Sequence, residues 1–256
     1  MAGKNRERQR AFKESKRVSL EAHKVADDAR KHASHYKLDW FTPTKMQREI
    51  QVSYYHNDLT AVQGSSGTGK STTVIHLALS DLKDKRYGKI VFCKTPAELG
   101  DDKIGFLSGS ANEKLATHFD SMRSIFHSFM TKEKLVMEEA HGVIEFTIPN
   151  FIAGKTIDNA IFIIDEAQLL SGGTMKLLLE RAGLNTKVVV LGDRAQTYAA
   201  SKRTDGFTDF VKRITVVEDG HRISDETTMG YVELKAGDNM RSPLSRRVVE
   251  LYEEEV

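Results

Sequence analysis

One short run limits what this chain can fold into: Gly64-Ser65-Ser66-Gly67-Thr68-Gly69-Lys70-Ser71. A glycine, four residues and then Gly-Lys-Ser is the spacing of a P-loop, which joins a strand to a helix. Glycines let the backbone wrap closely round a polyphosphate, and the N–H groups at the start of the helix donate to its oxygens. In that pattern Lys70 reaches the β- and γ-phosphates, and the Ser71 hydroxyl binds Mg²⁺.

The residues on both sides of this run have the pattern that a P-loop needs. Residues 59–62 form a short apolar stretch that is typical of a strand. After the run, apolar residues recur at helical spacing, namely Val74, Ile75, Ala78, Leu79 and Leu82. The sequence therefore predicts one nucleotide site between a strand and a helix.

Apolar runs alternate with helical stretches along the rest of the chain. The candidate strands are residues 59–63, 89–93, 160–164, 187–191 and 231–234, with an edge strand at 143–148. Nearly continuous apolar runs are expected for parallel strands that are covered on both faces. Candidate helices span 71–83, 112–140 and 174–182, Thr42 is expected to cap a helix that starts at Pro43, and a hairpin is expected near Asp219-Gly220. The alternation predicts an α/β fold with ligands at the carboxyl ends of the strands.

Two acidic residues follow the apolar run at 160–164. Asp165 and Glu166 are expected at the tip of a buried strand, where Asp165 helps to hold Mg²⁺ and Glu166 polarises the attacking water. Neighbouring side chains on a strand point to opposite faces, so we expect the two carboxylates to divide these roles. An acidic strand end that only faces solvent is the alternative, and the P-loop upstream argues against it.

Two further polar residues follow later elements. Gln196 comes shortly after the apolar run at 187–191, beside the acidic strand, where it can sense the γ-phosphate. Ser242 and Pro243 predict the start of a helix, so Arg241 lies in the loop just before it. An arginine held there can stabilise charge on the transferred phosphoryl group, and a plain surface arginine is the competing interpretation.

Charge and composition set the remaining limits. The seven basic and two acidic residues in 1–17 give this end a charge of +5, whereas the whole chain carries +2. Such an arm can bind nucleic acid through its phosphates or stay a solvated terminus, and the sequence favours neither. We expect residues 1–40 to be a partly helical or disordered arm and 41–256 to be the domain. No apolar run approaches the roughly 20 residues that cross a bilayer, and no apolar segment follows the basic start, so we expect a cytoplasmic protein.

The motifs taken in order resemble the core of the superfamily 1 helicases: GSSGTGKS at 64–71, DEAQ at 165–168, GDRAQ at 192–196 and DNMRSP at 238–243. In detail they are similar to the PhoH-like family of phosphate-starvation ATPases, and the similarity covers residues 40–255. The resemblance implies a three-layer, RecA-like P-loop NTPase with a mainly parallel sheet. It also implies ATP and Mg²⁺ as cofactors and homo-oligomeric rings such as hexamers.

The resemblance adds roles for particular residues. It makes Gln47, on the helix before the P-loop, the candidate reader of adenine. It makes Arg181 a candidate contact to the γ-phosphate between subunits, and Arg241 a finger that acts within its own subunit or on a neighbour. The residues then expected to bind nucleotide are Gln47, Gly64, Ser65, Ser66, Gly67, Thr68, Gly69, Lys70, Ser71, Thr72 and Arg181. Those expected to carry catalysis are Lys70, Glu166, Gln196 and Arg241, and those expected to bind the metal are Ser71 and Asp165.

We therefore expect an ATPase that couples hydrolysis to binding or remodelling of nucleic acid, with RNA or single strands favoured. A translocating helicase needs two RecA-like lobes and this sequence supplies one, so helicase-like activity is expected only from an oligomer. A small-molecule P-loop kinase is one alternative, and a nucleotide-gated, nucleic-acid-binding scaffold with negligible turnover is another. Release of free phosphate that depends on Glu166 would separate the ATPase from both.

Overall fold

A single parallel sheet organises the computed structural model, which describes residues 36–95, 111–193, 205–238 and 242–253. Its strands are β1 (Leu59–Gln63), β2 (Lys89–Lys94), β3 (Ile144–Thr147), β4 (Ala160–Asp165), β5 (Thr186–Gly192) and β8 (Met229–Glu233). They lie in the order β3-β2-β4-β5-β1-β8, and every neighbouring pair is parallel. The predicted α/β class is confirmed, and so is the edge position of the strand expected at 143–148.

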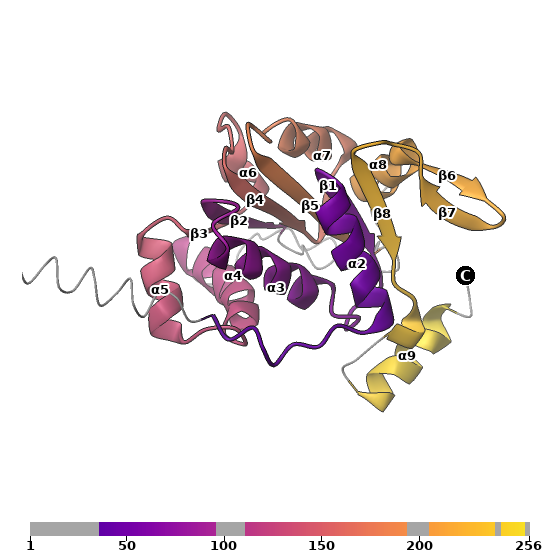
Figure 1. The fold of residues 1–256 in the computed structure, drawn as a ribbon, viewed down its shortest axis with the longest axis horizontal. Helices are drawn as coiled ribbons and strands as arrows, with labels where there is room; N and C mark the ends of the chain where they lie inside the picture. The colour runs from indigo at the N-terminus through magenta and orange to yellow at the C-terminus, as the bar shows by residue number, and fades with distance from the viewer. Residues whose placement is uncertain (1–35, 96–110, 194–204, 239–241, 254–256) are drawn as a thin grey trace, which may run out of the picture. The chain divides into compact units, whose positions relative to one another are not determined.

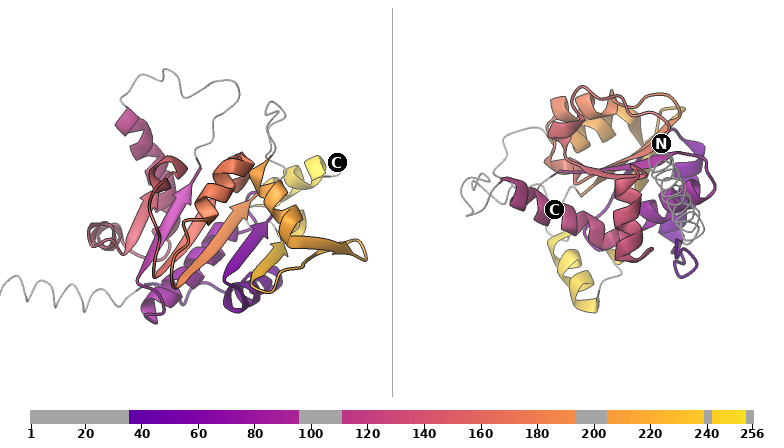
Figure 2. Two further views of the ribbon diagram at one scale, coloured as in Figure 1. Left: turned by 90° about the horizontal axis from the view of Figure 1, so that it is seen from above. Right: turned by 90° about the vertical axis from the view of Figure 1, so that its left-hand side faces the viewer.

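Helices cover both faces of the sheet. One face carries α2 (Lys45–His56), α3 (Lys70–Lys83), α4 (Ala111–Phe126) and α5 (Lys132–Ala140). The other carries α6 (Pro149–Ile152), α7 (Gly172–Leu179) and α8 (Gly206–Ile214). Figure 1 and the right-hand view of Figure 2 show the two helical layers with the sheet between them. The predicted three-layer arrangement is therefore present.

The core follows the alternation of side chains along each strand. Ala61, Phe162 and Val190 point toward α7 and α8 and belong to one buried cluster with Leu178 and Phe207. The intervening strand residues, such as Val62, Ile163 and Leu191, are also fully buried and face the opposite layer. Because both faces of the strands are covered, the runs can be apolar at every position, which is the pattern that made them visible in the sequence.

Helix boundaries differ from the prediction in three places. Helix α2 is capped by Thr44 and not by Thr42, because Thr44 and Gln47 form a capping box. The helix expected at 112–140 is two helices, since Thr131 accepts from the Lys134 N–H and caps a new one. The helix expected at 174–182 begins at Gly172, after the cap residue Ser171, and ends at Leu179.

The C-terminal part was predicted more closely. Strands β6 (Thr215–Glu218) and β7 (His221–Ser224) form the antiparallel hairpin expected around Asp219-Gly220, and it extends from the domain in Figure 1. A short turn η3 (Ala236–Asp238) precedes α9 (Pro243–Glu253). Ser242 accepts from the Ser245 N–H, so the predicted cap is present. Within the described parts of the chain, no helix has the length and apolar character needed to cross a bilayer.

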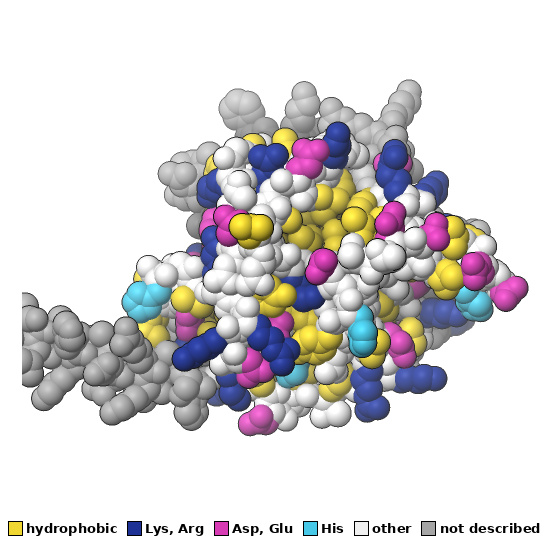
Figure 3. All heavy atoms as spheres, turned by 45° about the horizontal axis from the view of Figure 1, so that its top comes forward, with side chains coloured by type: hydrophobic (Ala, Val, Ile, Leu, Met, Phe, Trp, Pro, Cys, Tyr) yellow, Lys and Arg dark blue, Asp and Glu magenta, His cyan; other side chains and the backbone are white. Residues whose placement is uncertain are grey.

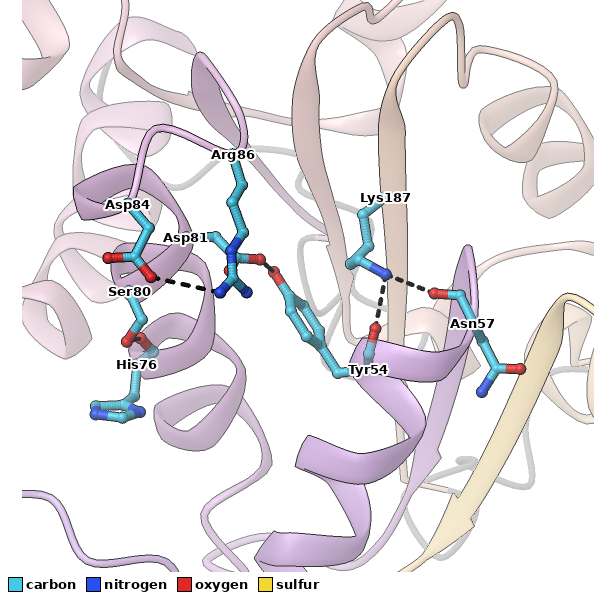
Figure 4. A network of polar contacts seen from close by, with 8 residues as sticks. All are labelled: Tyr54, Asn57, His76, Ser80, Asp81, Asp84, Arg86 and Lys187. Atoms are coloured by element: carbon cyan, nitrogen blue, oxygen red, sulfur yellow. Dashed lines mark hydrogen bonds and ion pairs between the residues drawn. The ribbon is translucent and has the colours of Figure 1, made fainter.

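A polar network joins α2, α3 and β5 at the amino edge of the sheet (Figure 4). The Tyr54 hydroxyl donates to Asp81 at 2.8 Å, and Arg86 pairs with the same carboxylate at 3.0 Å. The buried Lys187 ammonium donates to the backbone carbonyls of Tyr54 and Asn57, at 2.6 and 2.5 Å. Burial raises the pKa of Asp81 and lowers the pKa of Lys187. A cation at the carbonyl end of α2 satisfies groups that the helix leaves without a partner.

Candidate nucleotide site

The P-loop connects the carboxyl end of β1 to the first turn of α3. Gly67 and Gly69 have φ values of 87° and 80°, a conformation that favours glycine. Gly69 is also the residue from which α3 starts, and a Cβ there would lie 2.5 Å from the Gln47 amide nitrogen. Thr68 is buried, and its hydroxyl donates to the Ser65 carbonyl at 2.8 Å. The positive φ values and the close approach of Gln47 explain why the loop needs glycine at these positions. The Thr68 hydrogen bond fixes the conformation of the loop.

Lys70 lies across the mouth of this loop. Its ammonium donates to the carbonyls of Gly64 and Ser65, the second at 3.0 Å. The following residues, Ser71 and Thr72, belong to the first turn of α3 and line the same cavity as Lys70. The amino end of a helix and a lysine therefore converge on one space, which is the arrangement that binds phosphate groups.

The cavity above the loop has a volume of about 590 Å³. The loop and the first turn of α3 contribute six lining residues, Ser66, Gly67, Gly69, Lys70, Ser71 and Thr72. The ends of β2, β4 and β5 contribute Lys94, Asp165, Glu166, Gly192 and Asp193. It lies at the carboxyl edge of the sheet, where the sequence predicted the ligand.

Asp165 and Glu166 both line this cavity, so the prediction that they point to opposite faces is wrong. Strand β4 ends at Asp165, and Glu166 has a φ of 56° in the left-handed region. The backbone therefore turns at once, and the Glu166 N–H donates back to an Asp165 carboxylate oxygen at 3.1 Å. The alternation rule holds only inside a strand, and Glu166 has already left it.

The charges around Asp165 suit a cation. Burial raises the pKa of this carboxyl to about 6, the neighbouring Glu166 adds to the rise, and Lys94 and Lys70 oppose it. A buried carboxylate beside a second one is stabilised by any positive charge that enters the space between them. Mg²⁺ is commonly held by one or two carboxylates together with nucleotide phosphates, so Asp165 with the Ser71 hydroxyl fits this ion.

Gln168 connects this acidic pair to the next strand, and the sequence analysis gave it no role. Its amide nitrogen donates to the Glu166 carboxylate at 2.7 Å, and its amide oxygen accepts from the Asp193 N–H at 3.0 Å. It thus bridges the tips of β4 and β5, which are neighbours in the sheet. Gln168 belongs to the DEAQ motif, but its contact with Asp193 depends on the pairing of β4 with β5, which the sequence does not specify.

Lys94 was also missed. It is the last residue of β2, and its ammonium lies 3.9 Å from a Glu166 carboxylate oxygen. Its carbonyl contacts the His118 ring at 3.2 Å, which connects α4 to the strand tip. Glu166 is therefore held from two sides, by Gln168 and by Lys94.

The sequence was compared with models of known protein families. A family model described as PhoH-like protein matches residues 42–253. The chain belongs to the PhoH-like protein family. The predicted family resemblance is thereby confirmed.

Relatives of this family are 27–28% identical to the chain over the residues that align. PhoH-like proteins of Synechocystis sp. and Bacillus subtilis are each 28% identical, over 210 and 212 residues. These matches cover 82% and 83% of this chain but 61% and 63% of the relatives, so the chain spans less than two thirds of their length. Protein PhoH of Escherichia coli K12 is 27% identical over 220 residues, which are 82% of this chain and 58% of that protein. A crystal structure of the Pyrococcus furiosus Hef helicase domain aligns with a TM-score of 0.41 and 13% identity, over 78% of this chain and 40% of that one.

The remaining predicted site residues of this PhoH-like chain fall into three groups. Gln47 lines the cavity, whereas Arg181 follows α7, where its carbonyl accepts from the Ile157 N–H ahead of β4. Asp165 ends β4, whose six residues span roughly 20 Å at about 3.3 Å each, so Arg181 lies at the opposite edge of the sheet. Gln196 and Arg241 lie outside the described residues, and their roles stay predictions.

Proposed function

We propose that the chain binds ATP with Mg²⁺ in the 590 Å³ cavity and hydrolyses it. The observation that carries this proposal is that the paired acids, Asp165 and Glu166, line the same cavity as Lys70 and Ser71. A P-loop alone serves kinases and hydrolases alike. A carboxylate that is held in place beside the phosphate-binding loop is what activation of water requires.

Each part of the cavity has a chemical role in this proposal. The triphosphate lies along the loop, where the N–H groups of 66–71 and the Lys70 ammonium neutralise its charge. Ser71 and Asp165 would hold Mg²⁺, which would supply further charge neutralisation to the phosphate oxygens. Glu166 orients the attacking water and accepts its proton, and Gln168 with Lys94 keeps that carboxylate pointed into the cavity.

Arg181 needs a second subunit in this proposal. Arg181 is at the edge of the sheet opposite the cavity, so it can reach a γ-phosphate only in a neighbouring chain. Assembly into a ring, with Arg181 or Arg241 completing the neighbour's site, is therefore part of the proposed function. Hydrolysis per subunit should then rise with protein concentration, and a flat profile at low concentration contradicts this part of it.

Coupling to RNA or single-stranded nucleic acid is proposed from the family and from the basic residues in 1–17. On the face seen in Figure 3, described Lys and Arg side chains are interspersed with Asp and Glu, and hydrophobic side chains lie between them. A mixed surface of this kind is not the continuous basic surface that backbone phosphates favour. We therefore assign the nucleic-acid contacts to another face or to the basic arm.

The test is phosphate release by the wild type and by Glu166→Gln, with and without single-stranded RNA and DNA. Loss of the general base should lower turnover by about 10²–10⁴-fold and leave binding of an ATP analogue intact. Glu226→Gln is a matched control, because it removes the same charge from an exposed position between β7 and β8. Equal background release from all three proteins would mean a nucleotide-gated scaffold, and a phosphorylated acceptor in place of free phosphate would mean a kinase.

A further inference from the structure

The cavity has a second, aromatic end that the phosphate chemistry does not use. Trp40, Phe41 and Thr42 line it from the segment before α2, and Ile125 lines it from α4. These residues are continuous with the P-loop wall, so one ligand can contact both ends. The Trp40 and Phe41 rings are nearly perpendicular, with 86° between their planes, so each offers its own surface. Aromatic surfaces beside a phosphate site suit a nucleobase, which is flat and largely apolar on its faces.

The aromatic rings in this wall pack against other rings of the domain. Trp40 stacks on Phe129, with 5.2 Å between ring centroids and 30° between planes, and Phe129 is fully buried. Phe41 packs on His76 of α3, with 4.8 Å between ring centroids. The segment itself is fixed, because the Lys37 N–H donates to the Phe129 carbonyl at 2.7 Å. Trp40 nevertheless stays 52% exposed, so the wall is rigid but open to a ligand.

Gln47 lies between the two ends, and its amide contacts the P-loop. The amide nitrogen donates to the Thr68 carbonyl at 3.3 Å, and the amide oxygen accepts from the Thr44 N–H at 3.0 Å. The side chain is only 2% exposed, and it occupies the space that a Cβ at Gly69 would take. Gln47 thus ties the start of α2 to the loop, which is a positioning contact.

We propose that the nucleobase packs against Phe41 and Trp40, and that Gln47 positions the P-loop and does not read the base. This inference rests on the proposed function, since it assigns the other half of the same ligand. Stacking on an aromatic ring tolerates every base because every base has a π-face. Adenine and guanine nucleotides should therefore bind within about tenfold of each other.

The sequence offers a direct probe, because Trp40 is its only tryptophan. Its fluorescence is recorded while a non-hydrolysable ATP analogue, the GTP analogue or inorganic tripolyphosphate is added with Mg²⁺, and binding is measured in parallel by calorimetry. Both nucleotides should change the emission, and tripolyphosphate should bind without changing it. Tripolyphosphate carries no base, so it reports the phosphate end alone.

Three variants then separate the roles. Phe41→Leu should weaken binding of both nucleotides about tenfold and leave tripolyphosphate binding unchanged. Trp40→Leu, followed by calorimetry alone, should do the same. Gln47→Ala should weaken all three ligands by the same factor, because it acts through the loop. Phe151→Leu is the matched control, since this ring is exposed on α6 and does not line the cavity.

The outcomes distinguish this inference from the proposed function. If the ATP analogue and tripolyphosphate both fail to bind, the nucleotide site itself is refuted. If the analogue binds while the Trp40 emission stays constant and Phe41→Leu has no effect on it, the base lies elsewhere and only this inference is overturned. If Gln47→Ala weakens the ATP analogue alone, Gln47 reads the base and the positioning role is wrong.

Discussion

Replacing Gln168 by leucine tests whether the bridge between β4 and β5 holds the site together. The change keeps the volume of the side chain but removes both hydrogen bonds. The Asp193 N–H then loses its acceptor in a buried place, at a cost of about 1–3 kcal/mol. The bond to the Glu166 carboxylate contributes less than the usual 1.5–3 kcal/mol for a charged acceptor, because that side chain is 31% exposed to solvent. Together the free energy of unfolding should fall by about 2–4 kcal/mol.

The assay is urea denaturation together with phosphate release. Turnover should fall at least tenfold, because Glu166 loses one of its two orienting contacts and misplacement of a catalytic group can cost about 10²-fold. Gln168→Glu is the matched comparison, since its carboxylate can still accept from Asp193 but lies against Glu166. In the folded variant, the negative charge of Glu166 should raise the pKa of the carboxyl introduced at position 168. The free energy of unfolding of this variant should therefore fall as pH rises through that raised pKa. If Gln168→Leu unfolds at the wild-type urea concentration and releases phosphate at the wild-type rate, the bridge has no such role.

Three further predictions concern the rest of the domain. Lys187→Met should lower the free energy of unfolding by about 2–3 kcal/mol, measured in urea, and leave the affinity for an ATP analogue unchanged because the network is at the opposite edge of the sheet. Cys93 is fully buried and burial raises the pKa of its thiol to about 12, so a thiol reagent at pH 8 should label the protein only after denaturant unfolds it. Burial also raises the pKa of Asp165 to about 6, so this carboxyl withdraws stability as pH rises from about 4 to 6. Asp165→Asn should therefore raise the free energy of unfolding, measured in urea, by about 3 kcal/mol at pH 7.5. The same substitution should have no such effect at pH 4, and an equal gain at both pH values would contradict the charge argument.

The strands could be predicted from the sequence because burial on both faces leaves a local mark. Each predicted strand lies within two residues of an observed one, and the run at 160–164 needs only Asp165 added to match β4. Helix starts were less predictable, because Thr42 and Thr44 are both good caps. The proline at 43 favoured the wrong one, although the Thr44 and Gln47 spacing of a capping box was present. The break between α4 and α5 has no glycine or proline to mark it.

The candidate site was predictable where one segment carries the whole signal. The P-loop and the acidic strand end are such segments, and the structure brings both to one cavity. The contacts of Gln168 and Lys94 were not, because each depends on which strands are neighbours. The order β2-β4-β5 brings Lys94, Glu166 and Asp193 to one edge, although about 100 positions separate the first from the last. The aromatic wall was missed because it depends on the packing of the segment before α2 against Phe129, which lies about 90 positions later in the sequence.

The backbone at Glu166 explains why the alternation of side chains along β4 did not predict the positions of the two carboxylates. A non-glycine residue in the left-handed region is disfavoured by roughly 1–2 kcal/mol, so a φ of 56° needs compensation from its surroundings. Its N–H donates to Asp165, and its carboxylate accepts from Gln168, which is itself anchored on Asp193. An extended Glu166 would follow the alternation of β4 and point to the opposite face from Asp165. The left-handed turn is therefore what places two consecutive carboxylates in one cavity, and removing the Gln168 bridge should release the turn together with the catalytic geometry.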